Sequence, residues 1–202
     1  MLAAEKTRGR PRAFNVNKAL DQALRVFWKN GYEGTSLPTL TKAMGINRPS
    51  LYATFGNKES LFRKAVDRYM EKSGEWMRDA FSQPTARATV ERLLKGAIGS
   101  PTPGKVRGCL LVQGALACSD SADPIRKELA CRRSELEALL QERFERAVAG
   151  GDLRPDADPA GLAKYVATFQ QGLAVQMAGG AKRDELLRAV DIALHAWPDS
   201  SN

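Results

Sequence analysis

A run of eight residues, Arg48 to Phe55, combines a side chain that can read a DNA base with side chains that can anchor a helix. At about 100° per residue on a helical wheel, Leu51 and Phe55 share one face, and Pro49 and Ala53 lie roughly opposite. The outward face is therefore small, so such a helix can enter a major groove, where Pro49 can touch a thymine methyl group. Arg48 flanks the Leu51 and Phe55 face, and its guanidinium can donate to O6 and N7 of guanine.

Arginines also alternate near the start of the chain, in the stretch Thr-Arg-Gly-Arg-Pro-Arg at residues 7–12. Gly9 and Pro11 disfavour a helix there. Arg10 and Arg12 can then extend along a minor groove, whose negative potential attracts arginine where the groove is narrow. We predict a flexible basic arm over residues 1–12, and a disordered tail that only improves solubility is the alternative.

The formal charge of the chain is concentrated in its first third. The 202 residues hold 31 Lys or Arg against 23 Asp or Glu, a net charge of +8, with a sequence pI near 9.6. Residues 1–72 contain 14 basic and 6 acidic residues, whereas residues 73–202 contain 17 of each. The excess favours one module that meets a polyanion, joined to a neutral remainder, and a merely solvated basic face is the alternative.

The other reactive side chains form no pattern that is typical of an enzyme or a metal site. His195 is the only histidine, and Cys109, Cys118 and Cys131 show no zinc-ligand spacing. Because no Ser–His–Asp set or glycine-rich phosphate loop occurs, we expect no catalysis, no metal and no cofactor. The N-terminus lacks the apolar stretch of a signal peptide, and no apolar run approaches the roughly 20 residues of a membrane helix. We therefore expect a cytoplasmic protein with free thiols and no membrane contact.

The elements that position these residues are all helical by periodicity, and we predict an all-α fold of about nine helices. Asparagine, serine or aspartate precedes several of them as an N-cap, with proline in the first turn, as at Asp123-Pro124. The predicted helices cover residues 16–30, 37–44, 48–55, 58–81, 84–98, 106–118, 124–148, 159–178 and 182–197.

The second and third of these helices, with a short turn between them, have the dimensions of a helix-turn-helix at about residues 35–55. The surrounding sequence resembles the DNA-binding domain of TetR-family transcriptional regulators over about residues 12–72. The matching residues are Phe27, Gly31, Tyr32, Thr35, Ser36, Met44, Gly45, Ile46, Leu51, Tyr52, Phe55, Lys58, Glu59, Ser60 and Leu61. The resemblance implies a helix-turn-helix DNA-binding domain at residues 13–60 and an effector-binding and dimerisation domain at residues 61–202.

The resemblance also implies contacts with the DNA backbone. Positions of the family that match Thr35, Tyr52, Thr54 and Lys58 commonly meet phosphates, which fix register rather than sequence. Family members often have histidine where Thr54 stands. A core position is the alternative for Tyr52, and a solvated one for Lys58 and Ser50. The candidate DNA-binding residues are Arg10, Arg12, Thr35, Ser36, Arg48, Pro49, Ser50, Tyr52, Thr54 and Lys58.

In this family the C-terminal helices bind a small effector and form the dimer. We expect a cavity between the fourth and eighth helices, although each candidate contact is also compatible with a core position. The candidates are Trp76, Met77, Phe81, Leu110, Gln113, Phe144 and Gln170. The last two helices, residues 158–178 and 182–197, carry wide apolar faces that can pair across a two-fold axis or pack inside the chain.

One cysteine is a candidate sensor. The segment Gly-Cys-Leu-Leu-Val-Gln at residues 108–113 resembles the equivalent helix of family members that sense electrophiles through cysteine. Cys109 is therefore a candidate redox residue, and a buried, inert thiol is the alternative.

These observations predict a homodimeric transcriptional repressor that leaves a palindromic double-stranded DNA operator when a small-molecule effector binds its C-terminal domain. A cysteine-based electrophile or redox-sensing regulator is one alternative. A non-specific architectural DNA-binding protein, favoured by the basic arm, is another.

Overall fold

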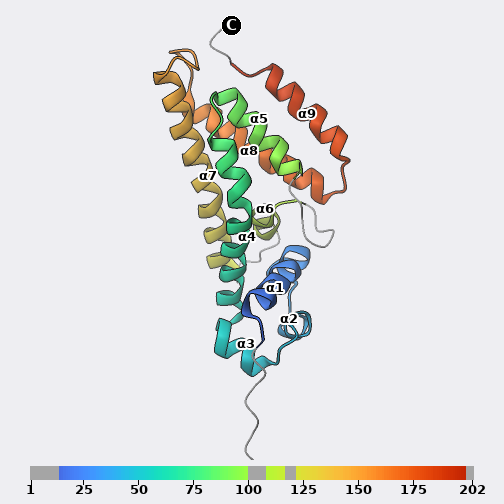
Figure 1. Ribbon diagram of the computed structural model, residues 1–202. Coiled ribbons are helices and arrows are strands. Elements are labelled where there is room, and N and C mark those ends of the chain that lie inside the picture. Colours follow the sequence, from blue (N-terminus) through green and yellow to red (C-terminus); the bar gives the residue numbers. More distant parts are fainter. Residues whose placement is uncertain (1–13, 100–107, 117–121, 199–202) are drawn as a thin grey trace, which may run out of the picture.

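The computed structural model describes residues 14–99, 108–116 and 122–198 of the chain. These residues form nine α-helices and no strand, which confirms the predicted all-α fold. The helices are α1 (Val16–Asn30), α2 (Leu37–Met44), α3 (Arg48–Phe55), α4 (Lys58–Phe81), α5 (Ala86–Gly99), α6 (Leu110–Leu116), α7 (Asp123–Ala149), α8 (Pro159–Ala178) and α9 (Arg183–His195). Helices α1–α3 lie at one end of an elongated molecule, and α4 connects them to the bundle formed by α5 and α7–α9 (Figure 1).

Side-chain caps determine where the short helices begin. Asn47 accepts a hydrogen bond from the amide of Ser50 at 2.9 Å at the start of α3. Asn57 does the same for the amide of Ser60 at 2.8 Å at the start of α4. Gly45 ends α2 with φ 68°, a left-handed conformation that favours glycine. Because helices of two turns are marginal alone, these caps and the tertiary packing hold α2 and α3 in place.

Two hydrophobic clusters hold the helices together. The first joins α1–α4 to α6 and the start of α7, and it includes Phe27, Leu51 and Phe62. The second joins the end of α4 to α5, α7, α8 and α9 around Phe144. Helix α4 thus contributes to both clusters, and its residues just after position 60 belong to the first of them. No helix in the described part of the chain is long and apolar enough to cross a membrane.

Several helix bounds differ from the sequence-based prediction, including those of α9, which covers residues 183–195 rather than 182–197. Helix α5 begins at Ala86 rather than Pro84, because the hydroxyl of Thr85 accepts the amide of Ala88 at 3.1 Å and acts as the cap. Asp123 is the first residue of α7 rather than its N-cap, and its carboxylate pairs with Lys127 at 2.7 Å. Helix α6 covers residues 110–116 of the predicted 106–118, and residues 106–107 and 117–118 lie outside the described residues.

Candidate DNA-binding surface and effector cavity

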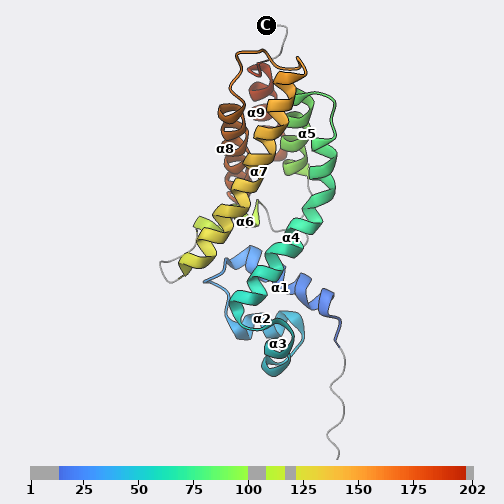
Figure 2. The same ribbon diagram turned by 90° about the vertical axis from the view of Figure 1, so that its left-hand side faces the viewer.

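Helix α3 is anchored by two apolar side chains and turns its other faces outward. Leu51 and Phe55 are 0% and 2% exposed, whereas Arg48, Pro49 and Thr54 are exposed. Ser50 is half-buried and Tyr52 is 48% exposed, so Tyr52 is not a core aromatic. In Figure 2, α2 and α3 lie at the end of the molecule farthest from α9. The arrangement matches the small outward face that the helical wheel predicts for a helix entering a major groove.

Thr35 and Ser36, both candidates for contact with DNA, have different environments. Thr35 is fully buried, and its hydroxyl donates to the carbonyl oxygen of Gly31 at 2.7 Å. The Thr35 side chain is therefore not accessible to a phosphate in this conformation, contrary to the contact that the resemblance implies. Ser36 is exposed, and its hydroxyl caps α2 by accepting the amide of Thr39 at 3.2 Å.

Lys58 is held at the start of α4 by an aromatic ring. Its ammonium group lies 4.5 Å from the centroid of the Tyr32 ring, a cation–π arrangement. Burial lowers the pKa of Lys58, and the nearby charge of Glu33 acts in the opposite direction. The lysine is therefore half-buried rather than fully solvated, at the positive end of the α4 dipole. Arg10 and Arg12 lie outside the described residues, so the basic arm stays a prediction.

Ion pairs fix α1 against α4. The carboxylate of Asp21 on α1 accepts hydrogen bonds from Arg68 at 3.0 Å and from Lys72 at 2.7 Å on α4. Burial raises the pKa of Asp21, but the hydrogen bonds and charges of Lys72 and Arg68 outweigh it and lower the pKa below its ordinary value. The position of the helix-turn-helix is thereby tied to α4.

A cavity of about 490 Å³ lies at the centre of the molecule, bounded by residues of α1, α4–α8 and the start of α9. It has the size of a small-molecule site. Four residues that the sequence analysis selected line it, namely Trp76, Met77, Gln170 and Cys109. Its wall is completed by Trp28, Tyr69, Met70, Ser73, Ala97, Ile98, Gly108, Leu111, Val112, Arg132, Arg133, Leu136, Ala167, Gln171, Ala174, Met177, Ala181, Lys182, Arg183 and Leu186.

Four other predicted effector contacts do not line this cavity. Leu110 and Phe144 are 1% and 0% exposed and belong to the two hydrophobic clusters. Phe81 packs against the second cluster. The side chain of Gln113 lies against Gly108, where a Cβ atom would come within 2.3 Å of its Nε2. Periodicity marks such residues as inward-facing, but it does not distinguish a core position from a cavity wall.

Helical periodicity did not predict the contribution of α1 to the cavity. Trp28 belongs to the helix-turn-helix domain, yet it lines the cavity and packs edge-on against Tyr69 of α4, with ring centroids 5.0 Å apart. The Tyr69 hydroxyl donates in turn to the Cys109 sulfur at 3.4 Å. The pKa of Tyr69 is raised well above its usual value by burial and by Cys109. The wall of the cavity therefore includes a residue of the helix-turn-helix domain.

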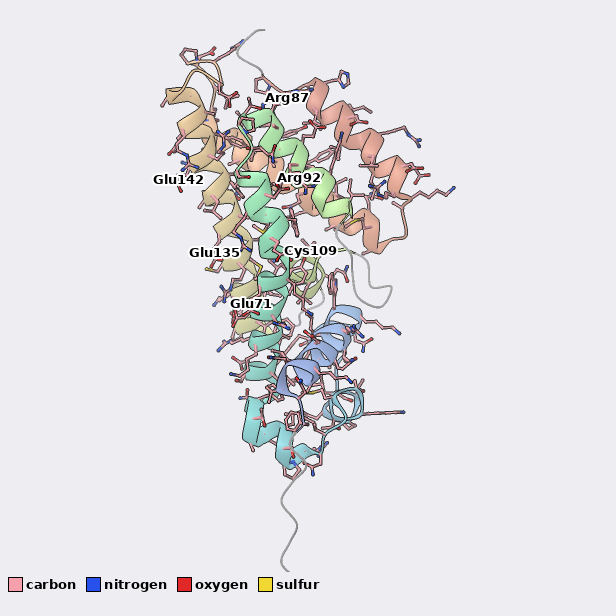
Figure 3. The ribbon with its side chains drawn as sticks, viewed as in Figure 1. Glu71, Arg87, Arg92, Cys109, Glu135 and Glu142 are labelled. Carbon is pink, nitrogen blue, oxygen red and sulfur yellow. The ribbon has the colours of Figure 1, made fainter. Side chains whose placement is uncertain are left out.

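The cysteines are free thiols where the structure describes them. Cys109 lies at the start of α6, beside α4, and is half-buried (Figure 3). Cys131 is exposed on α7, and Cys118 lies outside the described residues. Cys109 also lines the cavity, and its role as a sensor stays a prediction.

Most of the apolar residues of α8 and α9 are packed inside the chain. Val166, Leu173, Leu186, Val190, Leu194 and Trp197 are buried in the second hydrophobic cluster. A different set is exposed on α8, at the three- and four-residue spacing of one helical face, and consists of Tyr165, Thr168, Gly172 and Val175. Ile192 on α9 is 72% exposed. These exposed residues, rather than the wide apolar faces, are available for pairing with a second copy.

Comparisons with known proteins agree with this architecture. The protein-family model described as "Bacterial regulatory proteins, tetR family" matches residues 19–65, and that described as "Tetracyclin repressor-like, C-terminal domain" matches residues 83–193. The HTH-type transcriptional repressor ComR of Escherichia coli K12 is 32% identical over 201 residues, which cover 96% of this chain and 94% of ComR.

Two solved structures are similar over nearly the whole chain. A cysteine mutant of the TetR family transcriptional regulator CifR, complexed with 26-bp operator DNA, is 44% identical, with a TM-score of 0.88, covering 94% of this chain and 100% of that one. A TetR regulator from Rhodococcus sp. RHA1 is 41% identical, with a TM-score of 0.61, covering 90% of this chain and 98% of that one. The chain therefore belongs to the TetR family of bacterial transcriptional regulators.

Proposed function

We propose that this protein is a homodimeric repressor, which binds a palindromic operator through α3 and leaves it when a small molecule fills the central cavity. The observation that carries the proposal is the continuity between the two sites, because Trp28 of the helix-turn-helix domain forms part of the cavity wall. The repressor name of ComR supports repression, and the operator DNA bound to CifR supports operator binding.

Release follows from a shift between two conformations. In a dimer, two copies of α3 must enter successive major grooves about 34–36 Å apart. A ligand that displaces Trp28 and Tyr69 moves α1 and α4, which Asp21 ties together, and changes that separation. The fold-loss of operator affinity cannot exceed the ratio of the ligand's affinities for the wrongly spaced and the DNA-binding conformations.

The test is a footprint and a fluorescence-anisotropy titration on the intergenic DNA beside the gene. We expect Arg48→Ala to weaken operator binding by about 1–3 kcal/mol and to relax specificity at one base pair. Lys58→Ala should weaken binding to every sequence and reduce the salt dependence by about one phosphate contact. Arg146→Ala is the matched control, because this exposed arginine pairs with Glu142 on the same helix, α7, far from α3.

Two outcomes would contradict the proposal. Equal affinity for the intergenic DNA and a random duplex at the same salt concentration would favour an architectural protein, since specific binders usually differ by about 10³-fold or more. A footprint that neither Arg48→Ala nor Lys58→Ala changes would place the DNA-binding surface elsewhere.

A further inference from the structure

The charged residues around the cavity are all of one sign. Arg132 and Arg133 of α7 and Lys182 and Arg183 at the start of α9 line it, and no aspartate or glutamate does so among the described residues. The rest of the wall is apolar, aromatic or neutral, with Met70, Met77, Ile98 and Leu136 among its members. Such a cavity repels a cationic ligand and attracts an anion that carries an apolar body.

The two arginines of α7 differ in their partners. Arg132 forms ion pairs with Asp67 at 2.8 Å and with Glu135 at 3.8 Å. Arg133 is also half-buried, but it donates to the carbonyl oxygen of Leu111 at 2.7 Å and forms no ion pair with a carboxylate in the described part of the chain. A guanidinium has five N–H donors, so Arg133 keeps donors for a ligand. A partly desolvated cation without a counter-ion also gains the most from a bound anion.

Two indole N–H groups provide a second, independent observation. Trp28 and Trp76 both line the cavity, and their Nε1 atoms are buried without a hydrogen-bond acceptor. The six-membered ring of Trp76 packs against Gly96 of α5, since a Cβ atom added to that glycine would lie 3.1 Å from Cε3 of Trp76. The N–H group lies on the opposite edge of the indole, so it is turned away from α5. Buried donors without acceptors are rare in folded proteins, so an acceptor oxygen would be favourable beside either indole N–H group.

We propose that the cavity binds a small amphipathic anion, a molecule with one carboxylate and an unbranched or aromatic apolar body, with the carboxylate paired to Arg133. The apolar wall buries its body. The 490 Å³ volume suits a body of medium length. This anion would be the effector that releases the operator, and that regulatory role rests on the proposed function.

The experiment measures ligand binding by the full chain in the absence of DNA, with isothermal titration calorimetry. The probes are decanoate, 1-decanol and decylammonium, which share an apolar body and differ in the charge of the head. We expect decanoate to bind at least about 10-fold more tightly than 1-decanol, and decylammonium to bind most weakly, since a charge-assisted hydrogen bond to a partly buried partner has this magnitude.

The variants assign the anion to one arginine. Arg133→Met should reduce decanoate affinity to that of 1-decanol, about 10- to 100-fold, while the affinity for 1-decanol stays within about 3-fold and shows that the cavity is intact. Arg133→Lys should retain part of the preference for decanoate. Arg132→Met is the matched control, because Arg132 is already paired with Asp67, and its preference for decanoate should stay within about 3-fold of the unmodified chain.

Equal binding of decanoate and 1-decanol, a preference for decylammonium, or an equal loss in the two Met variants would overturn the inference. The titration contains no DNA, so its result stands even if the chain fails to bind an operator. Conversely, operator binding without any affinity for decanoate would reject this ligand class and leave the proposed repressor intact.

Discussion

Thr35 and Ser36 are neighbours with similar hydroxyl side chains, yet only Ser36 faces solvent. The difference is tertiary, because the turn after α1 places the Thr35 hydroxyl against the carbonyl oxygen of Gly31. Lys58 shows the same dependence on environment, since the ring of Tyr32 holds its ammonium group in place. At the scale of single residues, the neighbours of a side chain decide whether it supports the fold or meets DNA.

Thr35→Val separates these two roles. The substitution keeps the shape of the side chain but removes the hydrogen bond to Gly31, so we expect the free energy of unfolding to fall by about 0.5–1.5 kcal/mol. Urea denaturation measures this loss. Operator affinity of the folded variant should not change, because the side chain is fully buried. An affinity loss of tenfold with unchanged stability would restore Thr35 as a phosphate contact.

Cys109→Ser tests whether the thiol is required for sensing. Cys109 accepts a hydrogen bond from Tyr69, and serine retains an acceptor at this position. If the effector binds without a covalent bond, as we propose, decanoate should release the operator from the variant and from the unmodified chain at similar concentrations in an anisotropy assay. Loss of release in the variant, with decanoate binding retained, would instead favour the cysteine-based sensor.

At the scale of helices, α4 is an element that joins the two ends of the molecule. Its first half packs with α1 and its last turn with the bundle, and both hydrophobic clusters include its residues. Arg63 of α4 pairs with Glu128 of α7 at 2.6 Å, and Asp21 of α1 pairs with Arg68 and Lys72. We therefore expect movement of α4 to change the position of α1 and, with it, that of α3.

The Asp21 contact predicts an acid-dependent loss of stability. Its pKa is lowered from the ordinary 3.8, so its contribution is complete above that value and is lost as the pH falls through the lower pKa of the folded chain. Asp21→Asn should lower the free energy of unfolding at pH 7 by about 0.2–1 kcal/mol, as expected for a partly exposed pair. Urea titrations at pH 7 and pH 3 measure the difference in the free energy of unfolding between the variant and the unmodified chain. This difference should be smaller at pH 3.

Glu75→Gln is the control for this titration, because Glu75 is an exposed carboxylate on α4, the helix that carries Arg68 and Lys72. If the stability losses of Asp21→Asn and Glu75→Gln depend on pH in the same way, the ion pairs of Asp21 with Arg68 and Lys72 make no specific contribution to stability.

At the scale of the whole molecule, the pairing surface is narrower than the apolar faces of α8 and α9 suggest. Those faces are occupied by the core of the chain itself, so we expect a second copy to use the exposed stripe of α8, with Tyr165, Gly172 and Val175, and Ile192 of α9. Small residues in that stripe allow close approach of two helices. The operator spacing then depends on how this stripe sets the angle between two chains.

Gly172→Arg tests the stripe without harming the single chain. A Cβ atom at this position meets nothing within 4 Å, and replacing a helical glycine by arginine favours the helix by up to about 1 kcal/mol. We therefore expect a stable monomer by analytical ultracentrifugation, with operator affinity strongly reduced. Ala138→Arg on the exposed face of α7 is the matched control and should stay dimeric. A dimeric Gly172→Arg variant would place the interface elsewhere.

The sequence by itself determined the helical fold, the helix-turn-helix and the concentration of positive charge in the first third of the chain. These features are local, because periodicity, capping residues and composition act over a few turns. Only the tertiary structure decided which inward-facing residues line a cavity and which fill a core. Trp28 and Arg133 enter the cavity wall from helices far apart in the sequence, while Phe144 and most apolar residues of α8 and α9 are covered by other helices. A helical pattern shows which face is apolar, but the packing partner of that face depends on how all the helices are arranged.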